Sequence, residues 1–214
     1  MFVKHFEAPA FNRREALRYA GVKESTPETD ALMDECIALS QEAWQYSVCW
    51  EIYPSTKNGN QLDLGFVQIT SDALSVNLKD CGHIVLFAAT VGFGIDRLIA
   101  RYKAASPSRA HMLQALGAER IESLCDVFHE EIRQTMGDTR PRFSPGFGDV
   151  PLSLQKDIFR ALGCTSRIGV SLGENMLMSP SKSVSAIIGL SGESSERCVH
   201  NCALCTLTNC LYRR

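Results

Sequence analysis

The sequence feature that most constrains the fold is an apolar run of twelve residues, IVLFAATVGFGI, at positions 84–95. A helix that spans a bilayer needs about 20 consecutive apolar residues, so this run is too short for one and we assign it to a protein core. It forms either a central buried strand or a strand that passes into a helix around Asp96–Tyr102. With 214 residues, 45% of them hydrophobic, the chain can build one globular domain, or a main domain with a small appendage.

The charge balance argues against two classes of partner. The formal net charge is −2 and the sequence pI is about 6.2, so there is no basic field to attract nucleic acid or an anionic membrane. The opening residues, MFVKHFEAPAFNRRE, show neither the apolar stretch nor the cleavage signal of a secretory leader. We therefore expect a cytoplasmic protein that binds neither nucleic acid nor membranes.

Helices and strands are intermixed along the chain without a regular βαβ alternation, which favours an α+β domain over a doubly wound one. Asn12 with Glu15 forms a capping box, and Thr26 followed by Pro27 is a second helix start. We predict helices over 12–21, from Thr26 to about Leu39, over 109–134 and over 152–162. We predict strands at 47–53, 62–69, 167–172 and 183–190, with a turn at 57–61.

The segment RFSPGFGD at 142–149 precedes a predicted helix and has the composition of a ligand-binding loop. Gly146 and Gly148 permit backbone conformations closed to other residues, so the backbone can approach a ligand closely, with Phe147 as a stacking surface. Arg142 offers a planar fork to a carboxylate or phosphate. The alternative is an ordinary Pro-Gly turn with an exposed arginine. The spacing matches neither of the common phosphate-binding patterns, GxGxxG and GxxxxGK.

The longer segment RFSPGFGDVPLSLQ closely resembles the Arg-x-x-x-Gly-aromatic motif in the activation domain of cobalamin-dependent methionine synthase. Three other segments resemble stretches of that family in the same order: EALRYAG (15–21), AERIESLCDVFHEEIR (118–133) and IGVSLGENMLMSPSKSVSAIIGL (168–190). The resemblance runs from about residue 12 to 190. It implies a single α+β domain with a mostly antiparallel or mixed twisted sheet packed by helices. Since the chain has no room for the other modules of the full enzyme, it resembles a free-standing form of this domain.

The resemblance also implies a function. The family binds S-adenosylmethionine and reactivates cobalamin that has slipped to the cob(II) state, by one-electron reduction and methylation. We therefore expect an accessory protein for a corrinoid-binding protein or methyltransferase of the methionine synthase type. Its partner would carry the cobalamin, and an external donor such as a flavodoxin or ferredoxin would supply the electron.

By the same resemblance, Arg142 would bind the carboxylate of the methyl donor and Glu122 its ammonium group. The turn formed by Pro145, Gly146, Phe147 and Gly148 would contact the adenosyl part. Glu174, Ser183 and Ser185, in the next most similar segment, are further candidates. The alternative for these three is a surface carboxylate and ordinary strand hydroxyls.

Nine cysteines need a separate account, because an odd number in a reducing compartment argues against a disulfide framework. Five of them are scattered in apolar surroundings and are most simply small buried hydrophobes: Cys36, Cys49, Cys81, Cys125 and Cys164. The other four lie in CVHNCALCTLTNC (198–210) and are Cys198, Cys202, Cys205 and Cys210. The spacing of the first three also occurs in radical S-adenosylmethionine enzymes, but in those the motif is followed by most of a barrel.

Four thiolates at this spacing can bind an iron–sulfur cluster or a structural zinc ion, and a tail without metal is the third interpretation. We accordingly divide the chain into an S-adenosylmethionine-binding domain, 1–190, and a cysteine-rich metal-binding tail, 191–214. A cluster could relay the electron that reactivation requires. Two alternative functions follow from the tail: an iron–sulfur electron-transfer protein acting on a corrinoid partner, or a non-catalytic interaction module with a zinc tail.

Overall fold

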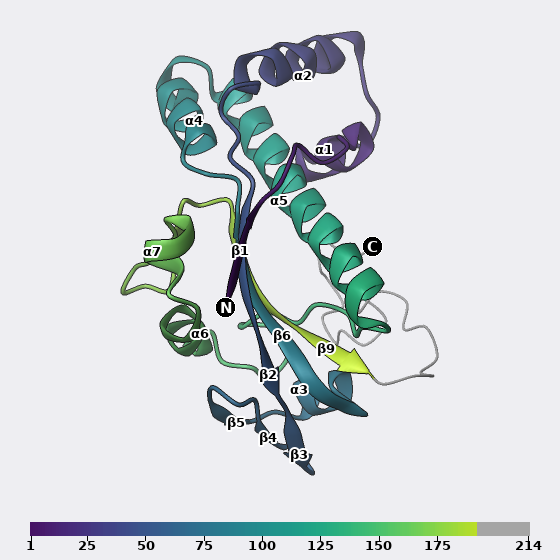
Figure 1. Ribbon diagram of the computed structural model, residues 1–214. Coiled ribbons are helices and arrows are strands. Elements are labelled where there is room, and N and C mark those ends of the chain that lie inside the picture. The colour runs from purple at the N-terminus through teal and green to yellow at the C-terminus, as the bar shows by residue number, and fades with distance from the viewer. Residues whose placement is uncertain (192–214) are drawn as a thin grey trace.

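A four-stranded sheet runs through the middle of the computed structural model, which describes residues 1–191 (Figure 1). The strands are β1 (Phe2–His5), β2 (Ser47–Pro54), β6 (Cys81–Thr90) and β9 (Ser183–Ser191). They follow the order β1-β2-β6-β9, and every neighbouring pair is antiparallel. The strands predicted at 47–53 and 183–190 are confirmed, whereas β1 was not predicted.

The apolar run supplies the buried part of the inner strand β6, which pairs with β2 on one side and β9 on the other. Past Thr90 the chain turns and enters α4 (Gly94–Ala105), so the second expectation, a strand that passes into a helix, is the correct one. Side chains of β6 alternate between two apolar clusters, as the period of a strand requires. One cluster takes Val85, Phe87 and Ala89, and the other takes Ile84, Leu86 and Ala88.

Helices cover both faces of this sheet (Figure 1). On the face of Phe87 lie α1 (Arg13–Tyr19), α2 (Pro27–Ser40), α4 and the long α5 (Pro107–Met136). The ring of Phe128 on α5 is fully buried there, with its centroid 4.9 Å from that of Phe87 and 5.2 Å from that of Trp50. The opposite face packs against α6 (Leu154–Leu162) and α7 (Cys164–Ile168). The predicted α+β domain is therefore confirmed.

Both predicted helix starts are confirmed, but the capping box at Asn12 is only half formed, because the backbone N–H of Asn12 donates to Glu119 and not to Glu15. The Asn12 side chain accepts a hydrogen bond from the backbone N–H of Glu15 at 3.2 Å. The Thr26 hydroxyl accepts one from the backbone N–H of Thr29 at 3.3 Å. Each cap satisfies a backbone donor that the first helical turn leaves without an intrahelical partner.

The strand predicted at 167–172 is wrong for most of its length. Gly163 and Gly169, both in the left-handed conformation, bracket the single-turn helix α7. Only Ser171–Leu172 forms a strand, β7, which pairs with β8 (Met178–Ser179). The apolar alternation of this stretch resembled a strand, but the glycine at 169 ends a helix instead.

The strand predicted at 62–69 is broken in two. Gly65 has a φ of +77°, and its N–H donates to the Asp63 carboxylate at 2.9 Å, so the chain turns there. A small antiparallel sheet results, with strands β3 (Thr56–Asn58), β4 (Gln61–Asp63) and β5 (Gln68–Thr70). The predicted turn at 57–61 joins the first two. The short helix α3 (Asp72–Asn77) follows and lies beside this sheet at the bottom of Figure 1.

None of the helices within residues 1–191 combines the length and the apolar character that a bilayer-spanning helix needs.

Candidate functional site

The segment that leads into the predicted loop is held along the free edge of β9. The backbone N–H of Arg140 donates to the carbonyl oxygen of Gly189 at 2.8 Å. Phe143 and Ile187 exchange two backbone hydrogen bonds, each 2.9 Å long. This short ladder fixes the backbone on both sides of Arg142 against the central sheet.

Arg142 lies against α5 and forms ion pairs with two carboxylates on that helix. Its Nη1 is 2.8 Å from an oxygen of Asp126, and its Nη2 is 3.2 Å from an oxygen of Glu122. The arginine side chain is only 19% exposed, so the alternative of an exposed arginine is wrong. The structure thus brings together Arg142 and Glu122, the two residues predicted for the ends of an amino acid. Asp126 was not predicted, although its position four residues after Glu122 places both on one face of the helix.

A hollow of about 180 Å³ adjoins this pair, between α1 and α5. Its lining residues are Asn12, Glu15, Tyr19, Glu119, Glu122, Ser123 and Asp126. Four of these are carboxylates, so the hollow favours a positively charged ligand group. It is smaller than the roughly 300–1,000 Å³ of pockets that enclose a drug-sized ligand, so it can take one end of such a ligand. The resemblance over 15–21 pointed to α1 but singled out neither Glu15 nor Tyr19.

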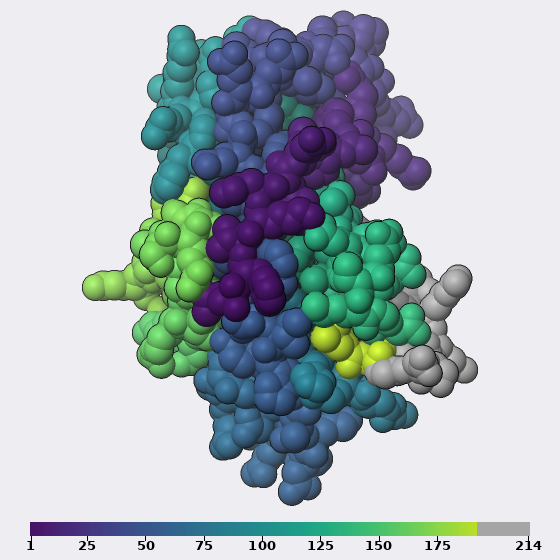
Figure 2. All heavy atoms as spheres, in the orientation of Figure 1, coloured from purple at the N-terminus to yellow at the C-terminus, as the bar shows by residue number. Residues whose placement is uncertain are grey.

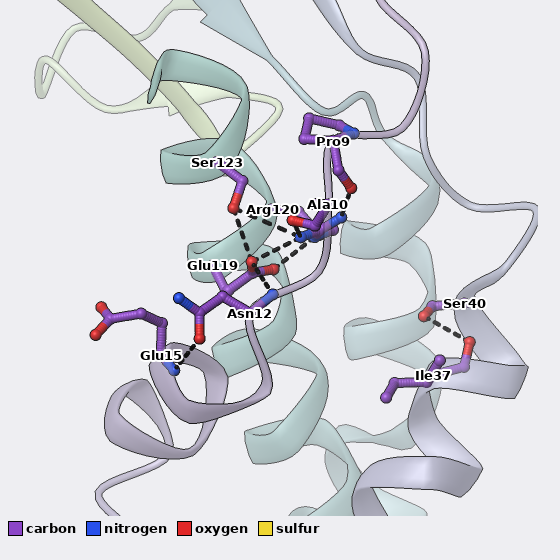
Figure 3. A network of polar contacts seen from close by, with 9 residues as sticks. All are labelled: Pro9, Ala10, Asn12, Glu15, Ile37, Ser40, Glu119, Arg120 and Ser123. Atoms are coloured by element: carbon purple, nitrogen blue, oxygen red, sulfur yellow. Dashed lines mark hydrogen bonds and ion pairs between the residues drawn. The ribbon is translucent and has the colours of Figure 1, made fainter. Parts of the chain in front are cut away.

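A buried ion pair holds the wall of this hollow in place (Figure 3). Glu119 and Arg120 are 1% and 5% exposed, with 2.5 Å between Oε2 and Nε. The guanidinium of Arg120 also donates to the carbonyl oxygens of Pro9 and Ala10, at 2.7 and 2.8 Å. The Glu119 carboxylate accepts the backbone N–H of Asn12 at 2.9 Å. The segment before α1 is therefore fixed to α5. In Figure 2 the N-terminal segment, in purple, runs across the molecular surface.

The turn after Arg142 has the predicted backbone conformations, but Pro145, which was predicted to contact the ligand, is not exposed. Gly146 and Gly148 both have positive φ, +89° and +55°, which only glycine adopts readily. Phe147 is 62% exposed and free to make a surface contact. Pro145 is buried, so it packs inside the protein. The exposed part of this turn is therefore Gly146–Gly148.

Ser183 and Ser185 lie elsewhere. Ser183 donates its hydroxyl hydrogen bond to the carbonyl oxygen of Pro180 at 2.8 Å and also contacts the Thr90 hydroxyl at 2.9 Å. Because side chains alternate along β9, both serines share the face of Ile187, which packs with α6 and α7. Arg142 pairs with α5, which covers the other face. The structure does not bring these serines close to Arg142 and the two carboxylates that pair with it.

Glu174 is also apart from that group. It is exposed in the turn between β7 and β8, where the N–H of Gly173 donates to the carbonyl oxygen of Leu177. Within residues 1–191, no hydrogen bond or ion pair links Glu174 to Arg142 or Glu122. Its environment is that of a surface carboxylate.

The described part of the chain, 1–191, holds no group of three or more His, Cys, Asp or Glu side chains arranged to bind a metal. The predicted metal ligands Cys198, Cys202, Cys205 and Cys210 lie outside these residues. The five scattered cysteines are free thiols, and all but the half-buried Cys81 are fully buried. This agrees with the prediction that they act as small hydrophobes.

The comparisons with known proteins agree with this architecture. The family described as "Vitamin B12 dependent methionine synthase, activation domain" matches residues 66–204, which is more than half of the chain. The chain belongs to this family. The match includes α5, the loop at 142–149 and β9, and so covers Glu122, Asp126 and Arg142.

One solved structure with the activation-domain fold is titled "Crystal Structure of the MetH Reactivation Domain bound to AdoHcy". It superposes on this chain with a TM-score of 0.67, covers 92% of this chain and 81% of its own, and shares 15% of the residues. At this level of identity the likeness concerns the fold. No curated protein matches the chain significantly.

Proposed function

We propose that the chain binds S-adenosylmethionine and acts as the reactivation partner of a cobalamin-carrying protein of the methionine synthase type. Membership of the activation-domain family supports this role. The observation that carries the proposal is the pairing of Arg142 with Glu122 at the edge of an acidic hollow. A free amino acid end carries a carboxylate and an ammonium on one carbon, so its site needs a cation and an anion side by side.

The geometry of Arg142 leaves capacity for a ligand. A guanidinium has five N–H donors, and the two ion pairs engage one terminal nitrogen each. The remaining N–H groups can bind the carboxylate of S-adenosylmethionine, while Asp126 keeps the guanidinium in place. Glu122 is 36% exposed and can accept the ammonium group.

The charge of the hollow suits this donor. S-adenosylmethionine carries a sulfonium and an ammonium against one carboxylate, so it is a net cation. Four carboxylates line the hollow: Glu15, Glu119, Glu122 and Asp126. Glu15 is paired with Arg18 and Glu119 with Arg120. Glu122 and Asp126, in contrast, share the single charge of Arg142, so the excess negative charge lies at these two carboxylates. The backbone of Gly146–Gly148 would then contact the adenosyl part.

In this role the chain's residues bind and orient the methyl donor and keep its amino acid end fixed. The partner's cobalamin, once reduced by one electron from a flavodoxin or ferredoxin, supplies the methyl acceptor. No proton transfer is needed at the methyl group, so the site requires no general base. We also propose that the predicted tail, with its four cysteines, is a separate metal-binding unit, which begins at 192 because Ser191 is the last residue of β9.

Equilibrium dialysis of the full chain with labelled S-adenosylmethionine tests the proposal. We expect saturable binding, competition by S-adenosylhomocysteine, and much weaker competition by adenosine, which lacks the amino acid end. The Glu122→Gln variant should bind more weakly, while Glu130→Gln, which alters an exposed pair on the same helix, serves as the control. Absence of saturable binding by the wild-type chain would refute the proposed S-adenosylmethionine site. A second assay would follow methylation of cob(II)alamin on a corrinoid protein with a chemical reductant.

A further inference from the structure

A carboxylate at the end of the candidate loop attaches this loop to the small helix α3. Oδ1 of Asp149 accepts hydrogen bonds from the Ser71 hydroxyl and from the backbone N–H of Ala73, the latter at 3.2 Å. Its Oδ2 accepts the backbone N–H of Asp72 at 2.6 Å. The first turn of a helix leaves its N–H groups without intrahelical partners, and here a residue from far along the chain supplies them.

The residue before Asp149, Gly148, also contacts α3, by close packing against Ala73. A Cβ on Gly148 would lie 2.7 Å from the Cβ of Ala73, so only glycine lets the loop backbone lie on this turn of α3. Its φ of +55° adds a second reason for glycine. Two consecutive loop residues are thus fixed against α3, one by hydrogen bonds and the other by close packing.

The loop is therefore held at two places. At its start, Phe143 pairs with Ile187 of β9, next to Arg142. At its end, Asp149 holds α3. Between them the chain forms a tight turn, in which the N–H of Gly146 donates to the carbonyl oxygen of Val150 at 3.0 Å. The first attachment fixes the arginine, and the second fixes the backbone of the turn.

We propose that Asp149 is a positioning residue for donor binding: by holding α3, it sets the place of Gly146–Gly148 relative to Arg142. This inference rests on the proposed function, because it concerns the same site. Asp149 acts through the backbone of the turn and is not assigned a contact with the donor. Its hydrogen bonds, the one from Ser71 first, lower the pKa of its carboxyl, so it is ionised at neutral pH.

The inference gives α3 an indirect role in donor binding, through the backbone of the turn that Asp149 attaches to it. A shift of this turn would change the contacts that its backbone can make with the methyl donor, so its position matters for affinity. Residues near Ser71, far from Arg142 in the sequence, should therefore affect donor affinity.

The test compares Asp149→Ala with Asp63→Ala in the full chain. Asp63 is the matched control, because it also accepts a backbone N–H within the small sheet but makes no described contact with the loop. We expect Asp149→Ala to weaken S-adenosylmethionine binding by about tenfold or more, and Asp63→Ala to leave it unchanged. Asp149→Asn, which keeps one acceptor oxygen, should recover part of the loss.

Hydrogen exchange provides a readout that does not depend on the donor. In Asp149→Ala, amides of 144–150 and of α3 should exchange faster, while those of α5 stay protected. If Asp149→Ala fails to fold, Ser71→Ala tests the same contact from the other side and should weaken binding in the same direction. Normal affinity in the folded Asp149→Ala and Ser71→Ala variants would overturn the positioning role. Failure of the wild-type chain to bind the donor would instead overturn the proposed function, and the exchange data would still report on the attachment.

Discussion

Nη2 of Arg142 lies 3.2 Å from Oε2 of Glu122, although the two residues are 20 positions apart in the chain. One comes from a loop held on the edge of β9 and the other from the middle of α5. An amino acid that binds here would have to insert its charged groups beside this pair. The pair is consequently the most informative place for substitutions.

Replacing Arg142 by alanine should weaken binding of S-adenosylmethionine by about 1.5–3 kcal/mol, the range of a hydrogen bond to a charged group. Arg142→Lys should recover only part, because an ammonium cannot form the planar two-pronged contact. Titration calorimetry on variants with unchanged circular dichroism measures both. Arg133→Ala, which removes an exposed ion pair with Glu130, should bind normally. Unchanged affinity in Arg142→Ala would place the donor elsewhere.

The buried pair of Glu119 and Arg120 predicts a large effect on stability. Arg120→Ala would leave the 1% exposed Glu119 carboxylate without its charge partner, which typically costs about 3–5 kcal/mol. Arg13→Ala breaks the exposed pairs with Asp30 and Asp34 and should cost about 0–1 kcal/mol. Urea denaturation compares the two. Equal costs would show that the buried network does not stabilise the fold as described.

Alanine at Gly148 should reduce both stability and donor affinity, since the new methyl group would meet Ala73 at 2.7 Å. The double variant Gly148→Ala, Ala73→Gly removes that clash and should regain part of the stability, leaving the cost of the positive φ. Thermal melts and dialysis would separate the two effects. At Gly146 the nearest atom is Leu152 Cδ1 at 3.3 Å, but the φ of +89° strains any other residue, so Gly146→Ala should reduce both stability and donor binding. A folded Gly146→Ala protein with normal affinity would contradict this.

Stability should fall as the pH drops below about 6.5, because His129 resists protonation. Burial first, and then the charge of Arg142, lower the pKa of His129 to about 4 in the folded protein. Asp126 and Glu130 act in the opposite direction, and Arg133 acts with Arg142. Between pH 6.5 and 4 the unfolded chain therefore binds a proton that the folded chain does not, so unfolding is favoured as the pH falls. Urea midpoints at pH 7.5, 6 and 5 measure this, and His129→Gln should flatten the dependence. If His129→Gln shows the same pH dependence of the urea midpoint, other titratable groups cause that dependence.

The cysteine tail carries an independent prediction. Replacing Cys202 and Cys205 by serine should abolish the bound metal, since a four-thiolate site loses two ligands. Binding of S-adenosylmethionine by the preceding domain should remain nearly unchanged. Metal analysis and an absorption spectrum after anaerobic purification distinguish iron–sulfur from zinc. If the metal is a cluster that delivers the electron, the variant should fail in reductive reactivation but still methylate chemically reduced cobalamin. Full metal content in the double variant would refute the ligand assignment.

Local sequence signals predicted those elements whose cause is local. The caps at Asn12 and Thr26, the long helix α5 and the strand β9 depend on neighbours in the sequence, and all four are present. The stretch at 167–172 misled because alternating apolar residues suit either a strand or a short helix beside a buried surface. What decides between them is the packing of α7 on β2 and β6, which the sequence does not display.

The candidate site was predictable only in part. The resemblance joined Arg142 to Glu122, and a helical period from Glu122 would have added Asp126. Glu15 depends on how α1 docks on α5, through a contact between Asn12 and Glu119 that spans 107 positions. The hold of Asp149 on α3 spans 77 positions. Such long-range pairs have no signature in a single sequence, because in the sequence each partner alone is an ordinary carboxylate or helix cap.

The pairing of β6 with β9 has a consequence for synthesis of the protein. Thr90 and Ser183 meet at one end of this pairing, although they are 93 positions apart. At about 5–20 residues per second, a ribosome needs roughly 5–20 s to deliver β9 after β6 has emerged. During that time the most apolar strand has one open edge, to which a chaperone or another nascent chain could bind. Bacterial or eukaryotic hosts that translate slowly or lack chaperone capacity should therefore lose this protein to aggregation during synthesis, even where the finished fold is stable.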